Sequence, residues 1–391
     1  MATPIRVSVK NKKRDLKPGI GQLLIIGFDG TTMSPRLASL LAKIQPAGVI
    51  LFARNITGAE QTHTLLRECQ KYVATPLFTC VDLEGGTVDR FRNVIGAAPS
   101  AAEVFATGSR ALYRRHGRVI GENCRTLGFN VDFAPVLDLA FEASRPVLNS
   151  RAVSDDPKQV VIYAREFLSG LREARVLGCG KHFPGLGEGK LDSHQDLPVI
   201  EKPLKKMLVE DLLPYRTLRH QLPFVMVSHA AYPQVTVERT PASLSKKWIS
   251  DILRKRIRYG GLIVSDDLEM GAVAEFATIE QTAVQHIRAG GDLALICHKE
   301  EAILRAYEAL VAESEKDRKF AKRAAEAASR VQKLRQKLLT LQRHSRQSAP
   351  TQTKTEKLTR RLWEFGEEIR MATLARSDLA RADHDGKVER G

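Results

Sequence analysis

The sequence predicts a (β/α)8 TIM barrel with a C-terminal helical extension, and three observations support this fold class. Eight short apolar runs occur along the body of the chain, helical patterns separate them, and polar residues follow at their C-terminal ends. Continuous apolar runs are typical of strands buried on both faces, as in parallel sheets. An open doubly wound sheet is the main alternative. No G-x-G-x-x-G follows the first run, which weakens a dinucleotide-binding fold.

Each apolar run is rich in Val, Ile, Leu and Phe and has the length of one strand. The runs lie at 22–30, 47–55, 77–86, 130–139, 176–185, 224–233, 261–271 and 292–299. The helical patterns between them lie at 35–43, 59–73, 109–127, 157–174, 204–222, 246–259 and 280–289. Strands that alternate with helices in this way favour a closed barrel.

Polar residues lie close to the C-terminal ends of the apolar runs. In a barrel these ends face one mouth, where active sites are built. Ordinary loops also begin with polar residues. That explanation is sufficient for one or two of the strand ends, but less so for charged residues at seven of them. The residues concerned are Asp29, Arg54, Asn55, Asp82, Glu84, Asp138, Lys181, His182, His229, Asp266 and His298.

Composition indicates a folded body with a basic tail. The chain has 391 residues, of which 43% are hydrophobic and 27% charged, so a sizeable core is expected and wholesale disorder is excluded. The net charge is +16, and residues 314–391 carry +9 of it. We therefore predict a catalytic barrel at 1–313 and a basic helical extension at 314–391.

The extension contains two stretches with apolar residues at helical spacing, 316–341 and 356–382. Ser, Thr, Gln and Pro between them predict a linker near 345–355, and the last residues are expected to be disordered. Helix packing or a solvated basic face is the favoured interpretation of the tail. Binding to nucleic acid or an anionic surface is the alternative. It predicts salt-sensitive DNA binding that disappears on truncation near Ser314.

The five cysteines are scattered, and no two form a C-x-x-C pair. Buried, reduced thiols in a reducing compartment are therefore expected. The N-terminus has no apolar segment typical of a signal peptide, and the first apolar run, 23–28, is too short to span a membrane. We expect a soluble cytoplasmic protein.

The segment 180–198, GKHFPGLGEGKLDSHQDLP, concentrates reactive side chains in a glycine-rich loop after a predicted strand. Asp192 and His194 are two residues apart, so the carboxylate can accept a hydrogen bond from the imidazole and raise its basicity. A histidine tuned in this way exchanges protons near neutral pH. Alternatively, Asp192 caps a loop turn, or the histidines bind a metal. No second cluster has zinc spacing, so no metal site is predicted.

Two further segments carry candidate site residues. In GLIVSDDLEMG, Asp266 follows directly on a strand, where a carboxylate can attack an electrophilic carbon or hold a cation. The alternative is that Asp266 caps the next helix, although Asp267 is the better candidate for that cap. In VDLEGGTVDRF, Asp82 and Arg90 suit a polar ligand such as a sugar, and a structural Asp–Arg pair is the alternative.

Together these segments resemble glycoside hydrolase family 3, and within it the single-domain β-N-acetylhexosaminidases of bacterial cell-wall recycling. The resemblance covers roughly residues 20–300 and implies a (β/α)8 barrel. Its most specific part is the string KHFPG followed by DSH. The matching motifs are DLEGG with Arg90, FAPVLD at 133–138, KHFPG with DSH at 181–194, and SDDLxM at 265–270.

The resemblance also implies a role for each matching residue. Asp266 matches the nucleophile, and His194 matches the acid/base, assisted by Asp192. The substrate-binding positions match Asp82, Arg90, Arg151, Lys181 and His182. Two positions depart from the family pattern: Asn149-Ser150-Arg151 replaces the usual Gly-x-Arg-Ser, and Leu186 stands where a histidine is frequent.

The reaction implied is that of a retaining exo-glycosidase that removes terminal β-linked N-acetylglucosamine from peptidoglycan-derived muropeptides through a covalent glycosyl-enzyme. The expected partner is a small carbohydrate, with no cofactor. A family 3 β-glucosidase and a phosphorolytic N-acetylglucosaminidase are the enzymatic alternatives. β-Glucosidases usually take the acid/base from another segment and lack Asp-x-His here. A non-catalytic sugar-binding protein, or a nucleic-acid-associated protein that uses the basic tail, is the alternative of another class.

Overall fold

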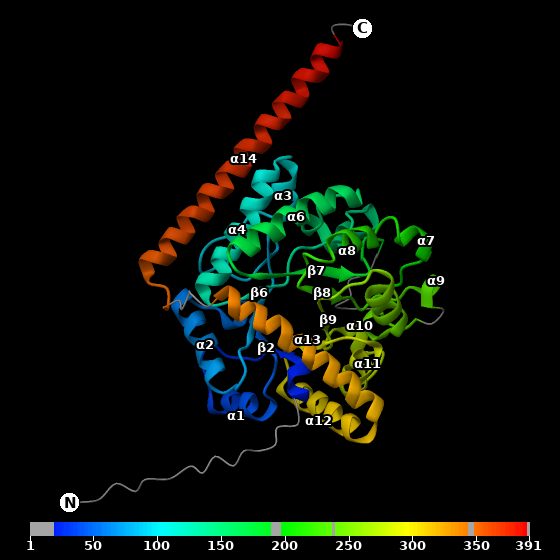
Figure 1. Ribbon diagram of the computed structural model, residues 1–391. Helices are drawn as coiled ribbons and strands as arrows, with labels where there is room; N and C mark the ends of the chain where they lie inside the picture. The colour runs from blue at the N-terminus through cyan, green and yellow to red at the C-terminus, as the bar shows by residue number, and fades with distance from the viewer. Residues whose placement is uncertain (1–18, 189–196, 237–238, 343–347, 389–391) are drawn as a thin grey trace, which may run out of the picture.

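The computed structural model of the chain describes residues 19–188, 197–236, 239–342 and 348–388 (Figure 1). Eight parallel strands close into a barrel in the order β1-β10-β9-β8-β7-β6-β3-β2, which confirms the predicted fold class. Each barrel strand lies in one predicted apolar run. The strands are β1 Leu24–Ile26, β2 Gly48–Ile50, β3 Phe78–Val81, β6 Val131–Asp132, β7 Leu177–Phe183, β8 Phe224–Val227, β9 Leu262–Asp267 and β10 Leu293–Ile296.

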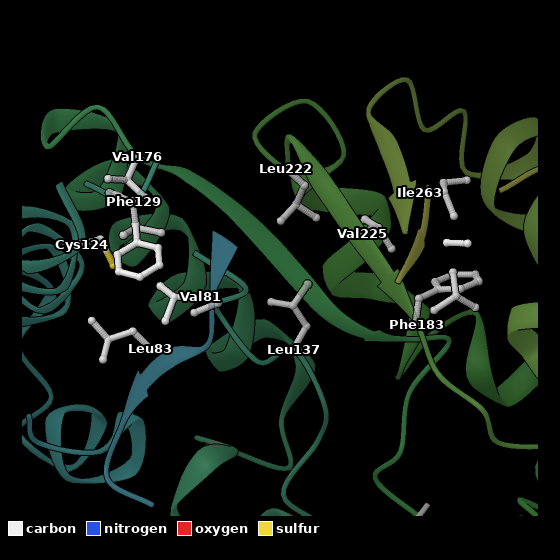
Figure 2. Close-up of a cluster of buried hydrophobic side chains, with 14 of the residues drawn as sticks. Val81, Leu83, Cys124, Phe129, Leu137, Val176, Phe183, Leu222, Val225 and Ile263 are labelled. Carbon is white, nitrogen blue, oxygen red and sulfur yellow. The ribbon is translucent and has the colours of Figure 1, made fainter. Parts of the chain in front are cut away.

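Side chains that alternate along each strand build two cores. In β9, Leu262 and Val264 belong to the cluster inside the barrel, whereas Ile263 packs in the cluster between the sheet and the helices. Figure 2 shows part of this outer cluster, including Val225 and Ile263 on neighbouring strands. Burying one such side chain stabilises the fold by about 1.5–3 kcal/mol. Two-sided burial explains why these strands have continuous apolar sequences.

Helices cover the outside of the barrel, and local sequence signals set their ends. Ser34 and Ser109 accept hydrogen bonds from backbone N–H groups in the first turns of their helices, and Gly128 ends α4 in the left-handed conformation. The main helices are α1 Pro35–Ile44, α2 Ala59–Lys71, α4 Arg110–Leu127, α6 Pro157–Glu173, α8 Leu212–Leu218, the π-helix Lys247–Arg256, α11 Ile279–Ala289 and α12 Glu300–Lys316.

The prediction of one helix over 204–222 is wrong. The structure has α7, Leu204–Met207, and then α8, because the chain turns between them. At this turn Asp211 lies 2.6 Å from the fully buried Lys202 ammonium. The remaining short elements are β4 Leu83–Gly85, β5 Val88–Asp89, α3 Ala101–Ala106, α5 Arg145–Leu148, α9 Pro233–Thr236 and α10 Gly271–Ala274.

Two helices follow the last barrel unit. Helix α13, Arg318–Gln342, lies across the end of the barrel at which the strands begin, and its Val331 and Leu338 join the cluster inside the barrel (Figure 1). Helix α14, Gln352–Val388, begins within the predicted linker and packs against α3 and α4. The predicted division at residue 314 falls within the last turn of α12.

All five cysteines are buried and unpaired, which confirms the expectation of buried thiols. Burial raises the pKa of the Cys69 thiol to about 12, so this side chain stays protonated and unreactive at neutral pH. Among the described helices, none is both long and apolar enough to cross a membrane.

Candidate active site

Three polar side chains face the inside of the barrel at its mouth. Asp82, Lys181 and Asp266 continue the rows of lumen-facing residues in β3, β7 and β9, because residues two apart on a strand share a face. The apolar members of these rows fill the barrel below them. The strands therefore bring together residues that are more than 180 positions apart in the sequence.

Lys181, Asp82, Glu84 and Arg151 form a network of alternating charge. The Nζ of Lys181 lies 2.7 Å from Asp82 Oδ1 and 2.7 Å from Glu84 Oε1. The Arg151 guanidinium donates two hydrogen bonds to the Glu84 carboxylate, at 2.7 and 2.9 Å. Burial alone would raise the pKa of Glu84, but Arg151 and Lys181 hold this pKa well below its usual range. Glu84 therefore stays ionised, and the four formal charges cancel.

The β4–β5 hairpin carries Glu84 into this network. Its turn contains Gly85 and Gly86, with φ angles of 80° and 59°, which side chains other than glycine rarely adopt. A Cβ atom on Gly85 would lie 2.1 Å from the backbone oxygen of Pro99. The two glycines thus permit the tight turn that aims the carboxylate at Lys181.

Beside the charged network, several side chains surround the ring of Phe52, just beyond β2. The guanidinium carbons of Arg54 and Arg90 lie 4.7 and 5.7 Å from the ring centroid, and the His298 ring stacks on it at 5.5 Å. Among the described residues, none accepts a hydrogen bond from the Nε of Arg90. A polar ligand that reached this buried N–H group would give it a partner.

His182 is fixed by Asp138. Its Nδ1 lies 2.7 Å from Asp138 Oδ2, and its backbone N–H donates to the same oxygen at 3.2 Å. The other oxygen, Oδ1, accepts from the backbone N–H of Leu186 at 2.8 Å. Since the carboxylate accepts from Nδ1–H, Nε2 is left free to bind a ligand. The buried Asp138 thus sets both the ring orientation and the tautomer.

Asp266 lies half-buried at the end of β9, close to two histidines. Burial alone would raise the pKa of its carboxyl group. The His182 imidazole, the backbone N–H of Asp267 at 2.9 Å and the Lys181 ammonium hold the pKa below its usual value. Asp266 is therefore a carboxylate at neutral pH, as a nucleophile must be.

His229 is fully buried, and burial lowers the pKa of its imidazole. Its Nε2 lies 2.8 Å from the carbonyl oxygen of Asp267, which can only accept. The neutral ring therefore carries its proton on Nε2, and its Nδ1 accepts from the Ser243 hydroxyl at 2.7 Å. This chain of hydrogen bonds positions the backbone that carries Asp266.

The remaining predicted site residues, Asp192 and His194, lie outside the described residues. The segment that contains them follows Glu188 and precedes Leu197. Within the described part of the chain, His, Cys, Asp and Glu side chains form no group of three or more that could hold a metal ion.

Four residues of the site had no assigned role in the sequence analysis. Glu84 and Asp138 lie inside the recognised motifs, and each proves to hold a candidate substrate-binding residue. His229 follows a predicted strand, and this position indicated that it lies at the mouth of the barrel. Ser243 had no signal, since it reaches His229 from a short segment after β8.

Comparison with known proteins identifies the family. Residues 15–334 match the N-terminal domain of glycosyl hydrolase family 3. The chain belongs to glycosyl hydrolase family 3. A β-hexosaminidase of Idiomarina loihiensis is 35% identical over 279 residues, which cover 70% of this chain and 83% of that protein. A β-hexosaminidase of Bordetella parapertussis is 36% identical over 300 residues, with coverage of 75% and 83%.

Solved structures agree with this family assignment. A family 3 β-N-acetylglucosaminidase from Paenibacillus sp. has a TM-score of 0.83 and 31% identity, and covers 90% of this chain and 68% of that one. LpqI of M. tuberculosis has a TM-score of 0.74 and 30% identity, with coverage of 82% and 94%. This family 3 member is a glycoside hydrolase, and its barrel mouth is the candidate active site.

Proposed function

We propose that the chain is a retaining exo-glycosidase that releases terminal β-linked N-acetylglucosamine from peptidoglycan-derived muropeptides. The observation that carries this proposal is the position of Asp266. Its ionised carboxylate lies at the end of β9, close to His182 and His229, in a mouth that also holds hydrogen-bonding charges of both signs. Such a site suits a neutral, polyhydroxylated ring.

The proposed reaction has two steps. Asp266 attacks the anomeric carbon, and the bond to the leaving oxygen breaks as protonated His194 donates its proton to that oxygen. The neutral imidazole of His194 then takes a proton from water, whose oxygen attacks the anomeric carbon and displaces the carboxylate. Two displacements retain the configuration. Asp192 stabilises the imidazolium form of His194.

The fixed side chains of the mouth bind the sugar in this proposal. Lys181 and Arg151 donate to hydroxyl oxygens while Glu84 holds them in place. Asp82 accepts from a hydroxyl group, and His182 binds through its free Nε2. The N–H groups of Arg90 extend this set at the rim. Because these groups are already paired and aligned, little reorganisation is needed when the substrate binds.

The names of the relatives support N-acetylhexosamine as the substrate class. Cleavage of muropeptides in cell-wall recycling is our extension of that class. The five unpaired cysteines support a reducing compartment, and we place the reaction in the cytoplasm.

The decisive experiment is mass spectrometry after exposure to a 5-fluoro N-acetylglucosaminyl reagent that traps the covalent intermediate. We expect an adduct on the peptide containing Asp266, and no adduct in Asp266→Ala. Asp251→Asn, which changes a partly exposed aspartate paired with Lys255 on the π-helix, is the matched control and should react like the wild type. An adduct on another peptide would overturn the assignment of the nucleophile.

Two further measurements separate the alternatives. Aryl β-N-acetylglucosaminide should be cleaved much faster than aryl β-glucoside, and the reverse preference would favour a β-glucosidase. The product should be free N-acetylglucosamine with or without inorganic phosphate. Formation of N-acetylglucosamine 1-phosphate would instead indicate phosphorolysis.

A further inference from the structure

A large hollow at the end of the barrel opposite the mouth has only basic charged residues in its described lining. The starts of β7 and β9, the segment before β8 and helix α13 enclose a volume of about 990 Å³, and α13 crosses this end of the barrel (Figure 1). The charged side chains are Arg172, Arg175, Arg219, Arg330, Lys333 and Lys337. We call this hollow the basic groove.

Most of these cations have no carboxylate partner. Arg330 lies 3.0 Å from Asp292, but the other five form no ion pair with any described residue. On α13, Lys333 and Lys337 are exposed and four positions apart, so they lie on one face of the helix. The groove therefore combines closely spaced, uncompensated positive charges, which attract a multivalent anion.

A second hollow continues the basic groove. Arg175 lines both hollows. The second one lies between the ends of α4 and α6 and the start of α14, where Lys354 and Lys357 are exposed and unpaired among the described residues. Together the two hollows are lined by ten Lys or Arg residues and only two acidic residues, Glu122 and Glu173. The positive lining thus extends over two adjoining hollows.

The lining of the groove is not uniformly polar. The partly exposed Pro223 and Leu334 line it together with the basic side chains. Apolar surface accepts the flat faces of bases, and guanidinium groups both bind phosphates and stack on bases. An extended, concave, basic surface with apolar parts matches a polymer that alternates phosphates and bases. A bilayer surface is flat and would contact only the raised parts of the lining.

We propose that the two hollows form a binding track for a single-stranded nucleic acid. The basic side chains bind the phosphates, and the apolar lining receives bases. Because the track and the catalytic mouth lie at opposite ends of the barrel, binding at the track leaves the hydrolytic site open. This binding function is independent of the proposed hydrolysis.

The test measures fluorescence anisotropy of a labelled 20-nucleotide oligothymidylate with the full chain over a range of salt concentrations. Reversing two phosphate-binding charges in Lys333→Glu/Lys337→Glu should reduce the salt slope by about 1.4, and the affinity at 0.1 M salt by about twenty-fold. Lys354→Glu/Lys357→Glu should have a similar effect, because it alters the second hollow. Both variants should hydrolyse the aryl glycoside at the wild-type rate.

Lys246→Glu/Lys247→Glu is the matched control, since it makes the same charge change at exposed positions near the mouth. It should bind the oligonucleotide like the wild type. An equal loss in this control would mean that overall charge, and not the track, determines binding, and would overturn the proposal. Binding to vesicles with 30% phosphatidylglycerol, without oligonucleotide binding, would overturn it in favour of a lipid surface.

Discussion

At the mouth of the barrel, Lys181 and Arg151 each lie 2.7 Å from a carboxylate oxygen, whereas at the opposite end Lys333 and Lys337 face a hollow whose described lining contains no carboxylate. Paired charges in a buried site exert little long-range field, but they present fixed donors and acceptors at short range. Unpaired surface charges of one sign act over roughly a Debye length of 8–10 Å. The same residue types thus serve a neutral ligand at one end and an anionic one at the other.

The largest effect is expected from Asp266→Asn. Asparagine keeps the size of the side chain but cannot form the glycosyl-enzyme, so kcat for the aryl glycoside should fall at least about ten-thousandfold, or about 5 kcal/mol in the barrier. Binding of the oligonucleotide should not change. Steady-state kinetics check the first effect, and substantial residual turnover at this position would contradict the proposed nucleophile.

Glu84→Gln should be the most destabilising single change in the mouth. It leaves the buried Lys181 and the Arg151 guanidinium without the carboxylate that holds both. Removing one partner of a buried ion pair lowers the free energy of unfolding by about 3–5 kcal/mol. Urea denaturation measures this loss. Glu300→Gln, which breaks the exposed pair with Arg36, is the control and should change stability by less than about 1 kcal/mol.

Leu338→Ala tests how firmly α13 is attached. Leu338 is buried in the cluster inside the barrel, so its truncation should lower the free energy of unfolding by about 2–5 kcal/mol. Leu339→Ala, one residue further along and exposed, should change it by no more than about 0.5 kcal/mol. Equal effects of the two variants would mean that α13 does not close the barrel in solution.

The strands were predictable because burial on both faces requires continuous apolar sequence, and this signal is local. The predicted helix over 204–222 failed because the turn is built around Lys202, whose ammonium is surrounded by Glu188, Glu210 and Asp211. These carboxylates lie 8 to 14 positions from Lys202, so the cluster forms only when the chain folds back on itself. The helical spacing of the apolar residues over 204–222 does not indicate this cluster.

The site shows the same division. Asp82, Lys181 and Asp266 were identified because each follows an apolar run, and the barrel brings such positions to one mouth. The partners that hold these residues in place were not identified from the sequence. Glu84 pairs with both Lys181 and Arg151 only because of the path that the β4–β5 hairpin takes. Residue type alone indicated which side chains could take part in catalysis or binding, whereas the residues that hold them in place could be identified only from the fold.

Low pH should weaken the charged network at the mouth of the barrel. The pKa of Glu84 is lowered from an ordinary value of 4.5, so its ionised form stabilises the fold above pH 4.5 and this contribution is lost as the pH falls below that value. The stability difference between the wild type and Glu84→Gln should therefore shrink below pH 4.5, by about 1.4 kcal/mol per pH unit at most. Denaturation at pH 5, 4 and 3 checks this. A constant difference would contradict the depressed pKa.

The smallest effect on stability is expected at the basic groove, where removal of a charge should stabilise the fold instead of destabilising it. Lys333 and Lys337 are like charges four residues apart on α13, a spacing that destabilises a helix by about 0.2–0.5 kcal/mol. Lys333→Gln should therefore raise the free energy of unfolding by this amount at low salt. The gain should vanish in 0.5 M NaCl, where the Debye length is only about 4 Å. Urea denaturation at both salt concentrations measures it, and a loss of stability would mean that Lys333 has a carboxylate partner after all. Removal of a charge from the mouth should destabilise the fold at either salt concentration, since burial shields that network from the ions.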